Sequence, residues 1–134
     1  MADQQPLEPA DQQPAEPADQ QPAEPAVQQP AVVRMWTGVV RTADVDDYAH
    51  YVETTGMTAY RATPGNLDAW LLTRDLGDGR TEVTTVSRWR SLADITAFAG
   101  PDAEKAVFYP DDDRWLIERD ERVRHYRQVG ATPV

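Results

Sequence analysis

The sequence of 134 residues contains no cysteine, and this absence removes several kinds of chemistry at once. Without thiols the chain can form no disulfide framework, no cysteine nucleophile and no zinc–thiolate site. No apolar run approaches the roughly 18 residues that suggest a membrane-spanning helix. The first residues also lack the charged start and apolar core of a secretory signal. We therefore expect a soluble cytoplasmic protein that does not bind membranes.

Basic residues are scarce as well, with 13 Lys and Arg against 23 Asp and Glu and a net charge of −10. A phosphate backbone attracts clustered Lys and Arg, so this composition argues against a nucleic-acid partner. The chain has only two histidines, His50 and His125, which lie far apart and form no HxH or HExxH spacing. We therefore predict no metal site.

The first 30 residues have no aromatic and no basic residue, yet they hold seven of the 11 prolines and six acids. They contain an eight-residue repeat, DQQPLEPA at 3–10 and DQQPAEPA at 11–18 and 19–26. Such a segment cannot bury enough apolar surface to offset the entropy of ordering. We predict a disordered acidic tail over residues 1–30, followed by one folded domain over residues 31–134. The PxxP spacing also resembles ligands of SH3-like grooves, although no flanking Arg or Lys supports that alternative.

The pattern of apolar residues in the remaining chain alternates between strand-like and helix-like periods. The resulting order βαββαβ predicts an α+β, ferredoxin-like fold, in which helices cover one face of a four-stranded antiparallel sheet. The expected strands are 32–41, 67–76, 80–90 and 121–129, and the expected helices are 44–62, 92–99, 102–109 and 111–118.

Strand 67–76 carries apolar residues on both of its faces, with Leu67, Ala69 and Leu71 on one side and Trp70 and Leu72 on the other. Burial of both faces requires a second layer on the face that the helices leave open. We therefore predict a homodimer.

The helix expected over 44–62 has one apolar stripe through Val45, Tyr48 and Val52. His50 lies away from this stripe, and α-helical spacing places Met57 and Tyr60 on the same face as His50. We expect His50 to be solvated.

Three segments resemble the antibiotic-biosynthesis monooxygenase family, which belongs to the dimeric α+β barrel superfamily. They are the run from Trp89 to Gly100, the sequence FAGPDAEKAVFYPDDDRWL at 98–116, and the pair His125-Tyr126 on the last strand. The resemblance extends over about residues 32–129 and implies two ferredoxin-like subunits closing into a barrel. Members of this superfamily include cofactor-free oxygenases, haem-degrading enzymes and other small-molecule enzymes.

The resemblance to the haem-degrading members fails at two positions. Those enzymes need a histidine in the region of the second helix and an asparagine on the first strand. Residues 103–109 contain no histidine, and residues 32–41 contain no asparagine. We therefore expect no cofactor, and haem is disfavoured.

The cofactor-free oxygenases need an apolar pocket, a base or hydrogen bond for the substrate oxygen, and exclusion of water. Their substrate is a small phenol or enol that is deprotonated and passes an electron to dioxygen. His125 is the candidate base or donor because an unperturbed histidine titrates near pH 6.5. A hydrogen-bonded histidine at the strand edge or dimer interface is the alternative. The residues expected to shape the substrate site are Trp36, Tyr51, Trp70, Trp89, Phe108 and Tyr109.

Three possibilities for the function therefore stay open. The first is a cofactor-free monooxygenase, and the second is an oxygen-independent isomerase, cyclase or dehydratase that uses the same pocket. The third is a non-catalytic small-molecule-binding protein. The acidic run Asp111-Asp112-Asp113 could suggest a cation site, but carboxylates at the start of a helix explain it more simply.

Overall fold

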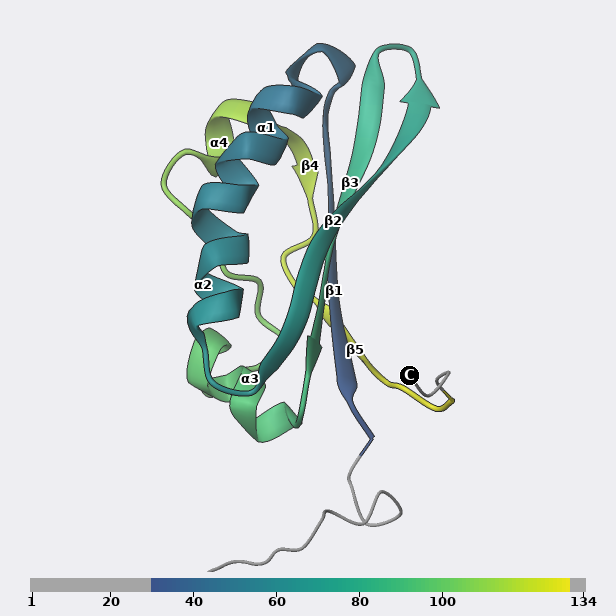
Figure 1. Ribbon diagram of the computed structural model, residues 1–134. Helices are drawn as coiled ribbons and strands as arrows, with labels where there is room; N and C mark the ends of the chain where they lie inside the picture. Colours follow the sequence, from purple (N-terminus) through teal and green to yellow (C-terminus); the bar gives the residue numbers. More distant parts are fainter. Residues whose placement is uncertain (1–29, 131–134) are drawn as a thin grey trace, which may run out of the picture.

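The computed structural model describes residues 30–130, so nearly all of the predicted tail lies outside the described residues. The chain forms a twisted antiparallel sheet with helices packed on one side of it (Figure 1). The elements in chain order are β1 (Val32–Arg41), the 3₁₀ turn η2 (Thr42–Asp44), α1 (Val45–Val52), the π-helical segment η3 (Glu53–Met57), α2 (Thr58–Ala62), β2 (Asn66–Gly77), β3 (Arg80–Trp89), α3 (Leu92–Ala99), α4 (Asp112–Trp115), β4 (Leu116–Arg119) and β5 (Arg124–Arg127).

The strands are arranged in the order β2-β3-β1-β4, and β5 also pairs with β1. The predicted α+β, ferredoxin-like fold is confirmed. The fourth position of the sheet differs from the prediction, because β4 and β5 together occupy the edge expected for one strand over 121–129. The helix predicted over 111–118 shrinks to the single turn α4, and its second half becomes β4.

The helix predicted over residues 102–109 is wrong, since the structure has only turns and a bridge there. The backbone amide of Ala106 donates to the carbonyl of Glu121, and the amide of Val123 donates to the carbonyl of Glu104. These bonds attach the segment to the chain that leads into β5. A helix would need its amides to bond within the segment instead.

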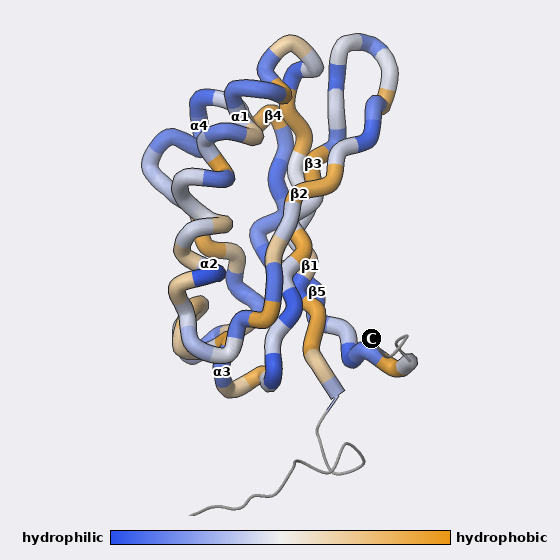
Figure 2. Tube along the Cα trace, viewed as in Figure 1, coloured by the Kyte–Doolittle hydropathy of each residue, from blue (hydrophilic) through white to orange (hydrophobic). Residues whose placement is uncertain are grey.

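The hydrophobic core lies between the helices and the sheet, where Trp89, Ile95 and Val40 are fully buried. The indole of Trp89 donates to the hydroxyl of Ser87 at 2.9 Å, so its polar atom is paired. Ser91 accepts from the amide of Asp94 and caps α3, as its residue type favours. Figure 2 shows the hydrophobic stretches in the strands and hydrophilic residues along α1.

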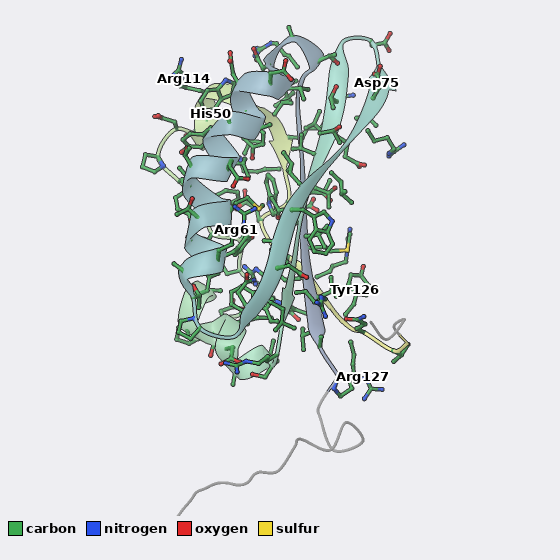
Figure 3. The ribbon with its side chains drawn as sticks, in the orientation of Figure 1. His50, Arg61, Asp75, Arg114, Tyr126 and Arg127 are labelled. Atoms are coloured by element: carbon green, nitrogen blue, oxygen red, sulfur yellow. The ribbon has the colours of Figure 1, made fainter. Side chains whose placement is uncertain are left out.

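The π-helical segment η3 changes which residues of the long helix face the sheet. Met57 and Tyr60 are buried, with only 1% and 7% of their surfaces exposed, although α-helical spacing places them beside His50. A π turn inserts one extra residue into the helix, which rotates all later side chains by about one α-helical step of 100°. This rotation moves both side chains onto the stripe of Tyr48 and Val52. His50 itself is exposed, as expected (Figure 3).

The face of the sheet opposite the helices is uncovered in the described chain. Trp70, Leu72 and Tyr126 lie there, and each exposes 40–48% of its surface. Figure 3 shows Tyr126 on the side of the sheet away from the helices. None of the described helices is long and apolar enough to span a membrane.

Candidate functional site

A cavity lies between the long helix α1–η3–α2 and the helix-covered face of the sheet. The empty space there is about 450 Å³, a figure that includes open solvent, so the cavity is partly open at its mouth. β1 and β3 contribute Arg34, Trp36 and Thr85 to its floor. The long helix contributes Tyr48, Val52 and Tyr60, and α3 contributes Phe98. The loop before α4 closes the remaining side with Phe108 and Tyr109, and the first residue of α4 adds Asp112.

The aromatic walls are held in fixed orientations. The indole nitrogen of Trp36 donates to the carbonyl of Asp120 at 2.7 Å, which fixes the ring in the floor. Phe108 meets Trp36 edge to face, with ring centroids 6.2 Å apart. Tyr60 packs on Phe98 at 4.7 Å, and the turn η3 is what directs Tyr60 inward. A planar apolar ligand would therefore meet preformed aromatic surfaces.

Arg34 is a buried cation in the wall of this cavity, with 1% of its surface exposed. Its Nη1 donates to the carbonyl of Ala103 at 2.5 Å, and its Nη2 donates to the carbonyl of Lys105 at 3.1 Å. Its Nε has no hydrogen-bond partner among the described residues. Burial lowers the pKa of the guanidinium, and the neighbouring Tyr60 partly offsets that effect. The guanidinium also lies 5.7 Å from the ring centroid of Phe98, within the range of a cation–π contact.

His125 does not line the cavity and instead lies behind Arg34. Its Nε2 is 3.0 Å from Nη1 of Arg34. Since a guanidinium has no lone pair to offer, Nε2 must accept this bond, and the proton of a neutral ring sits on Nδ1. Burial lowers the pKa of His125, and the charge of Arg34 lowers it further. The ring is therefore neutral at physiological pH, and its basic nitrogen is already occupied.

Asp112 is the carboxylate that faces the cavity, and it is buried with 6% of its surface exposed. Its Oδ2 accepts from the backbone amide of Tyr109 at 2.6 Å, and its Oδ1 accepts no bond from the described residues. Burial raises the pKa of Asp112, while the Tyr109 amide and Arg119 oppose that shift. A carboxylate of raised pKa beside an apolar cavity is a candidate general base.

Two tyrosine hydroxyls of the cavity are unusually weak acids. Burial raises the pKa of Tyr48, and the charge of Asp112 adds to the shift. Burial also raises the pKa of Tyr109. Both hydroxyls therefore keep their protons near neutral pH and can donate hydrogen bonds to a ligand.

The structure brings together only some of the residues predicted for the site. Trp36, Phe108 and Tyr109 line the cavity, whereas Trp89 is buried behind it in the core. Tyr51 lies outside the cavity, where its hydroxyl accepts from the amide of Asp111 at 2.9 Å. Trp70 lies on the opposite, open face of the sheet.

Sequence reasoning did not select Arg34, Tyr60 or Asp112 for this site. A lone arginine inside the apolar run VVRMW is a signal that could have identified Arg34, because burial of a charge costs free energy unless the charge is paired or hydrogen-bonded. Thr54-Thr55-Gly56 is a weak α-helical stretch, yet nothing in it specifies a π turn. Asp112 shares its sequence context with two exposed aspartates, so only the tertiary structure distinguishes it.

Within residues 30–130 no three or more His, Asp or Glu side chains are grouped so that they could hold a metal ion. The binding groups that the cavity offers are the guanidinium of Arg34, tyrosine hydroxyls, one buried carboxylate and aromatic faces. Such a set suits a small organic molecule with a planar body.

Fold and cavity together define a ferredoxin-like α+β domain with an aromatic-lined cavity under its long helix. Solved structures with the same fold include a putative antibiotic biosynthesis monooxygenase from Bacillus cereus, with 17% identity and a TM-score of 0.57 over 78% of this chain and 99% of that one. PA3566 from Pseudomonas aeruginosa is 9% identical, with a TM-score of 0.50 over 77% of this chain and 98% of its own. HapK from Hahella chejuensis is 12% identical, with a TM-score of 0.50 over 78% and 97%.

No protein-family model and no curated protein matches the sequence. The ferredoxin-like α+β fold that the resemblance to the antibiotic-biosynthesis monooxygenases implied for a single chain is confirmed by the structural comparisons. The identities are too low for the comparisons to carry over an activity.

Proposed function

We propose that the protein is a cofactor-free, monooxygenase-like enzyme that oxidises a small aromatic or enolisable substrate with dioxygen. The observation that carries this proposal is the aromatic cavity with the buried carboxylate of Asp112 in its wall. The similarity in fold to the protein from Bacillus cereus supports it.

In this proposal Asp112 is the general base. Its pKa is raised by burial, which strengthens the carboxylate as a proton acceptor, and its Oδ1 accepts no bond from the described residues. The base removes a proton from an activated C–H or O–H group of the substrate. The aromatic walls limit the access of water to the substrate, and the charge formed on the substrate is delocalised over its own conjugated system.

Dioxygen is the oxidant and takes electrons from the deprotonated substrate. One electron passes to dioxygen, and the resulting superoxide and substrate radical combine into a C–O bond. The peroxide takes the proton back from Asp112, after which the O–O bond breaks as the remaining proton leaves the same carbon. For a methylene substrate the products are one carbonyl group and one water molecule. The carbon loses four electrons as its two C–H bonds are replaced by C=O, and dioxygen gains the same four, with its second oxygen leaving as water that carries both hydrogens.

His125 takes a positioning role in this proposal. Because its Nε2 accepts from Arg34, the ring holds the guanidinium in the cavity wall and does not itself face the substrate. Replacement by alanine would release Arg34 and weaken substrate binding more than it slows the proton transfer.

The test is dioxygen uptake by the purified protein with anthrone- and quinol-type substrates and without added metal or flavin. Asp112→Asn removes the base and should reduce the uptake about 10²- to 10⁴-fold. Asp113→Asn is the matched control, because Asp113 is a sequence neighbour with an exposed side chain paired to Arg119. Equal loss in both variants, or full activity of Asp112→Asn, contradicts the proposal. Conversion of the substrate without oxygen uptake would favour an isomerase, cyclase or dehydratase, and binding without conversion a binding protein.

We also propose that the active form is a homodimer assembled through the open face of the sheet. Trp70, Leu72 and Tyr126 expose large apolar or aromatic surfaces there. A second copy would bury this face and close the two sheets into a barrel. Light scattering should give twice the chain mass, and Leu72→Glu should give a monomer that stays folded. A monomeric wild-type protein at micromolar concentration contradicts the assembly.

A further inference from the structure

Arg34 carries a charge that the described protein does not neutralise. Its acceptors among the described residues are two backbone carbonyls and the ring of His125, and no carboxylate lies within ion-pair distance of it in residues 30–130. Glu104, the acid that acts on the adjacent His125, is exposed and pairs with Arg122. Buried charges in proteins are ordinarily paired with an opposite charge, because desolvation is expensive.

The hydrogen-bonding capacity of the guanidinium is also unfilled. Arg34 has five N–H donors, and the two terminal nitrogens make the three bonds described above. The Nε is buried and has no partner among the described residues. An unsatisfied buried N–H on a cation gains the most from an anionic oxygen, since charge-assisted hydrogen bonds are about twice as strong as neutral ones.

The surroundings of Arg34 restrict what can carry that oxygen. Phe98 lies under the guanidinium, and Trp36 and Tyr60 continue the wall as aromatic faces. Tyr60 lines the same cavity and raises the pKa of Arg34, so a hydroxyl donor stands in the same wall as the cation. An aliphatic chain would leave these ring faces unmatched, whereas a planar unsaturated body covers them.

We propose that the cavity selects a planar, unsaturated ligand bearing an anionic oxygen, which Nε of Arg34 binds. This inference rests on the proposed function in treating the cavity as the substrate site. It adds the substrate class, which is an aromatic or conjugated carboxylate or a phenolate. In the oxidation proposed above, Arg34 would hold the oxygen at one part of the cavity, and Asp112 would take the proton at another.

The first experiment compares two ligands of nearly equal shape by calorimetry with the full chain. 2-Naphthoate carries the anionic oxygen, and 2-naphthamide replaces it with a neutral amide. We expect naphthoate to bind at least tenfold more tightly, which corresponds to about 1.4 kcal/mol. Arg34→Gln should abolish the preference, and Arg34→Lys should keep part of it. Equal affinity for both ligands, or no binding of naphthoate at millimolar concentration, overturns the proposal.

A control variant distinguishes a specific contact from a general change of charge. Arg41→Gln removes one positive charge from the same strand, and the Arg41 side chain is 66% exposed. We expect this variant to keep the full preference for naphthoate. If Arg41→Gln loses the preference as Arg34→Gln does, long-range attraction explains it and the proposed contact is wrong. The comparison of naphthoate with naphthamide on the wild-type protein requires no variant. It therefore still tests the proposal if Arg34→Gln fails to fold.

A second ligand distinguishes phenolates from carboxylates. 4-Nitrophenol is colourless when neutral and yellow as its phenolate, so binding can be followed at a pH below its ordinary pKa. Yellow colour on binding to the wild-type protein, absent with Arg34→Gln, identifies the phenolate class. No colour together with the preference for naphthoate identifies the carboxylate class. Absence of both signals overturns the inference.

The outcome is separable from that of the proposed function, because none of these measurements requires turnover. A charge preference without dioxygen uptake on any substrate leaves the anion site standing and removes the oxygenase. Dioxygen uptake with neutral substrates, together with equal affinity for naphthoate and naphthamide, leaves the oxygenase standing and removes the anion site.

Discussion

Two glycines allow a matched test of how the cavity wall is packed. A Cβ added at Gly38 of β1 would lie 2.6 Å from Cη2 of Trp36 and 3.1 Å from the backbone carbonyl oxygen of Glu118. The same addition at Gly56 of η3 meets nothing closer than 3.8 Å, at Cε2 of Tyr109. One methyl group therefore produces a clash at one position and an ordinary van der Waals contact at the other.

The clash at Gly38 has little room for relief. The indole nitrogen of Trp36 is bonded to Asp120, Phe108 packs against the ring, and the carbonyl of Glu118 belongs to the paired strand β4. Forcing an extra carbon into such a packed site costs about 1–3 kcal/mol. We expect Gly38→Ala to lower the free energy of unfolding by that amount. Gly56→Ala should be neutral or stabilising by up to about 0.5–1 kcal/mol, because alanine restricts the unfolded chain.

The assay is urea denaturation followed by circular dichroism, together with thermal melting at one fixed protein concentration. For a domain of this size, each kcal/mol lost at Gly38 should lower the melting temperature by about 4–8 °C. Gly38→Ala should also alter ligand binding, since Trp36 is part of the cavity floor. Wild-type stability of Gly38→Ala, or equal losses in both variants, would refute this account of the packing.

Three further results are expected. Because burial and Arg34 lower the pKa of His125, the unfolded chain takes up that proton first, so stability should decline as the pH falls below about 6.5. Denaturation as a function of pH should show a flatter decline for His125→Gln and no change for the exposed His50→Gln. Ser91→Ala removes the cap of α3 and should lower the free energy of unfolding by about 1 kcal/mol, whereas Ser91→Asp should keep most of the stability. Equal losses in both variants would show that capping of α3 is not the cause. Deletion of residues 2–30 should leave the melting temperature unchanged, and a large fall would show that the repeat packs on the domain.

Local sequence signals predicted most of the secondary structure. Alternating apolar residues located β1, β2 and β3 within one residue at each end, and Ser91 with Gly100 placed α3 at its observed bounds. The signals failed where backbone hydrogen bonds come from distant residues. The segment 102–109 has helical composition, yet its amides and carbonyls bond to the chain before β5.

The cavity residues likewise divide into those that the sequence could predict and those that only the tertiary structure placed. Its aromatic residues Trp36, Phe108 and Tyr109 could be selected from the sequence, because large planar side chains in a small domain indicate a place for a planar ligand. Trp70 and Trp89 are large planar side chains as well, but Trp70 lies on the open face of the sheet and Trp89 lies in the core. Which face a strand residue takes follows from the parity of its position, but which face carries the cavity depends on the helices packed against it.

The sequence by itself determined the order of strands and helices from β1 to α3, because residue spacing and capping residues act over a few positions. Only the tertiary structure decided the composition of the site. The π turn η3 rotates Tyr60 from the solvent side into the cavity, and burial distinguishes Asp112 from its two exposed neighbours. Arg34 is the proposed binding group because strands and loops far apart in the sequence enclose it and leave its Nε without a partner among the described residues. Desolvation depends on everything packed around a group, so no local pattern in the chain encodes it.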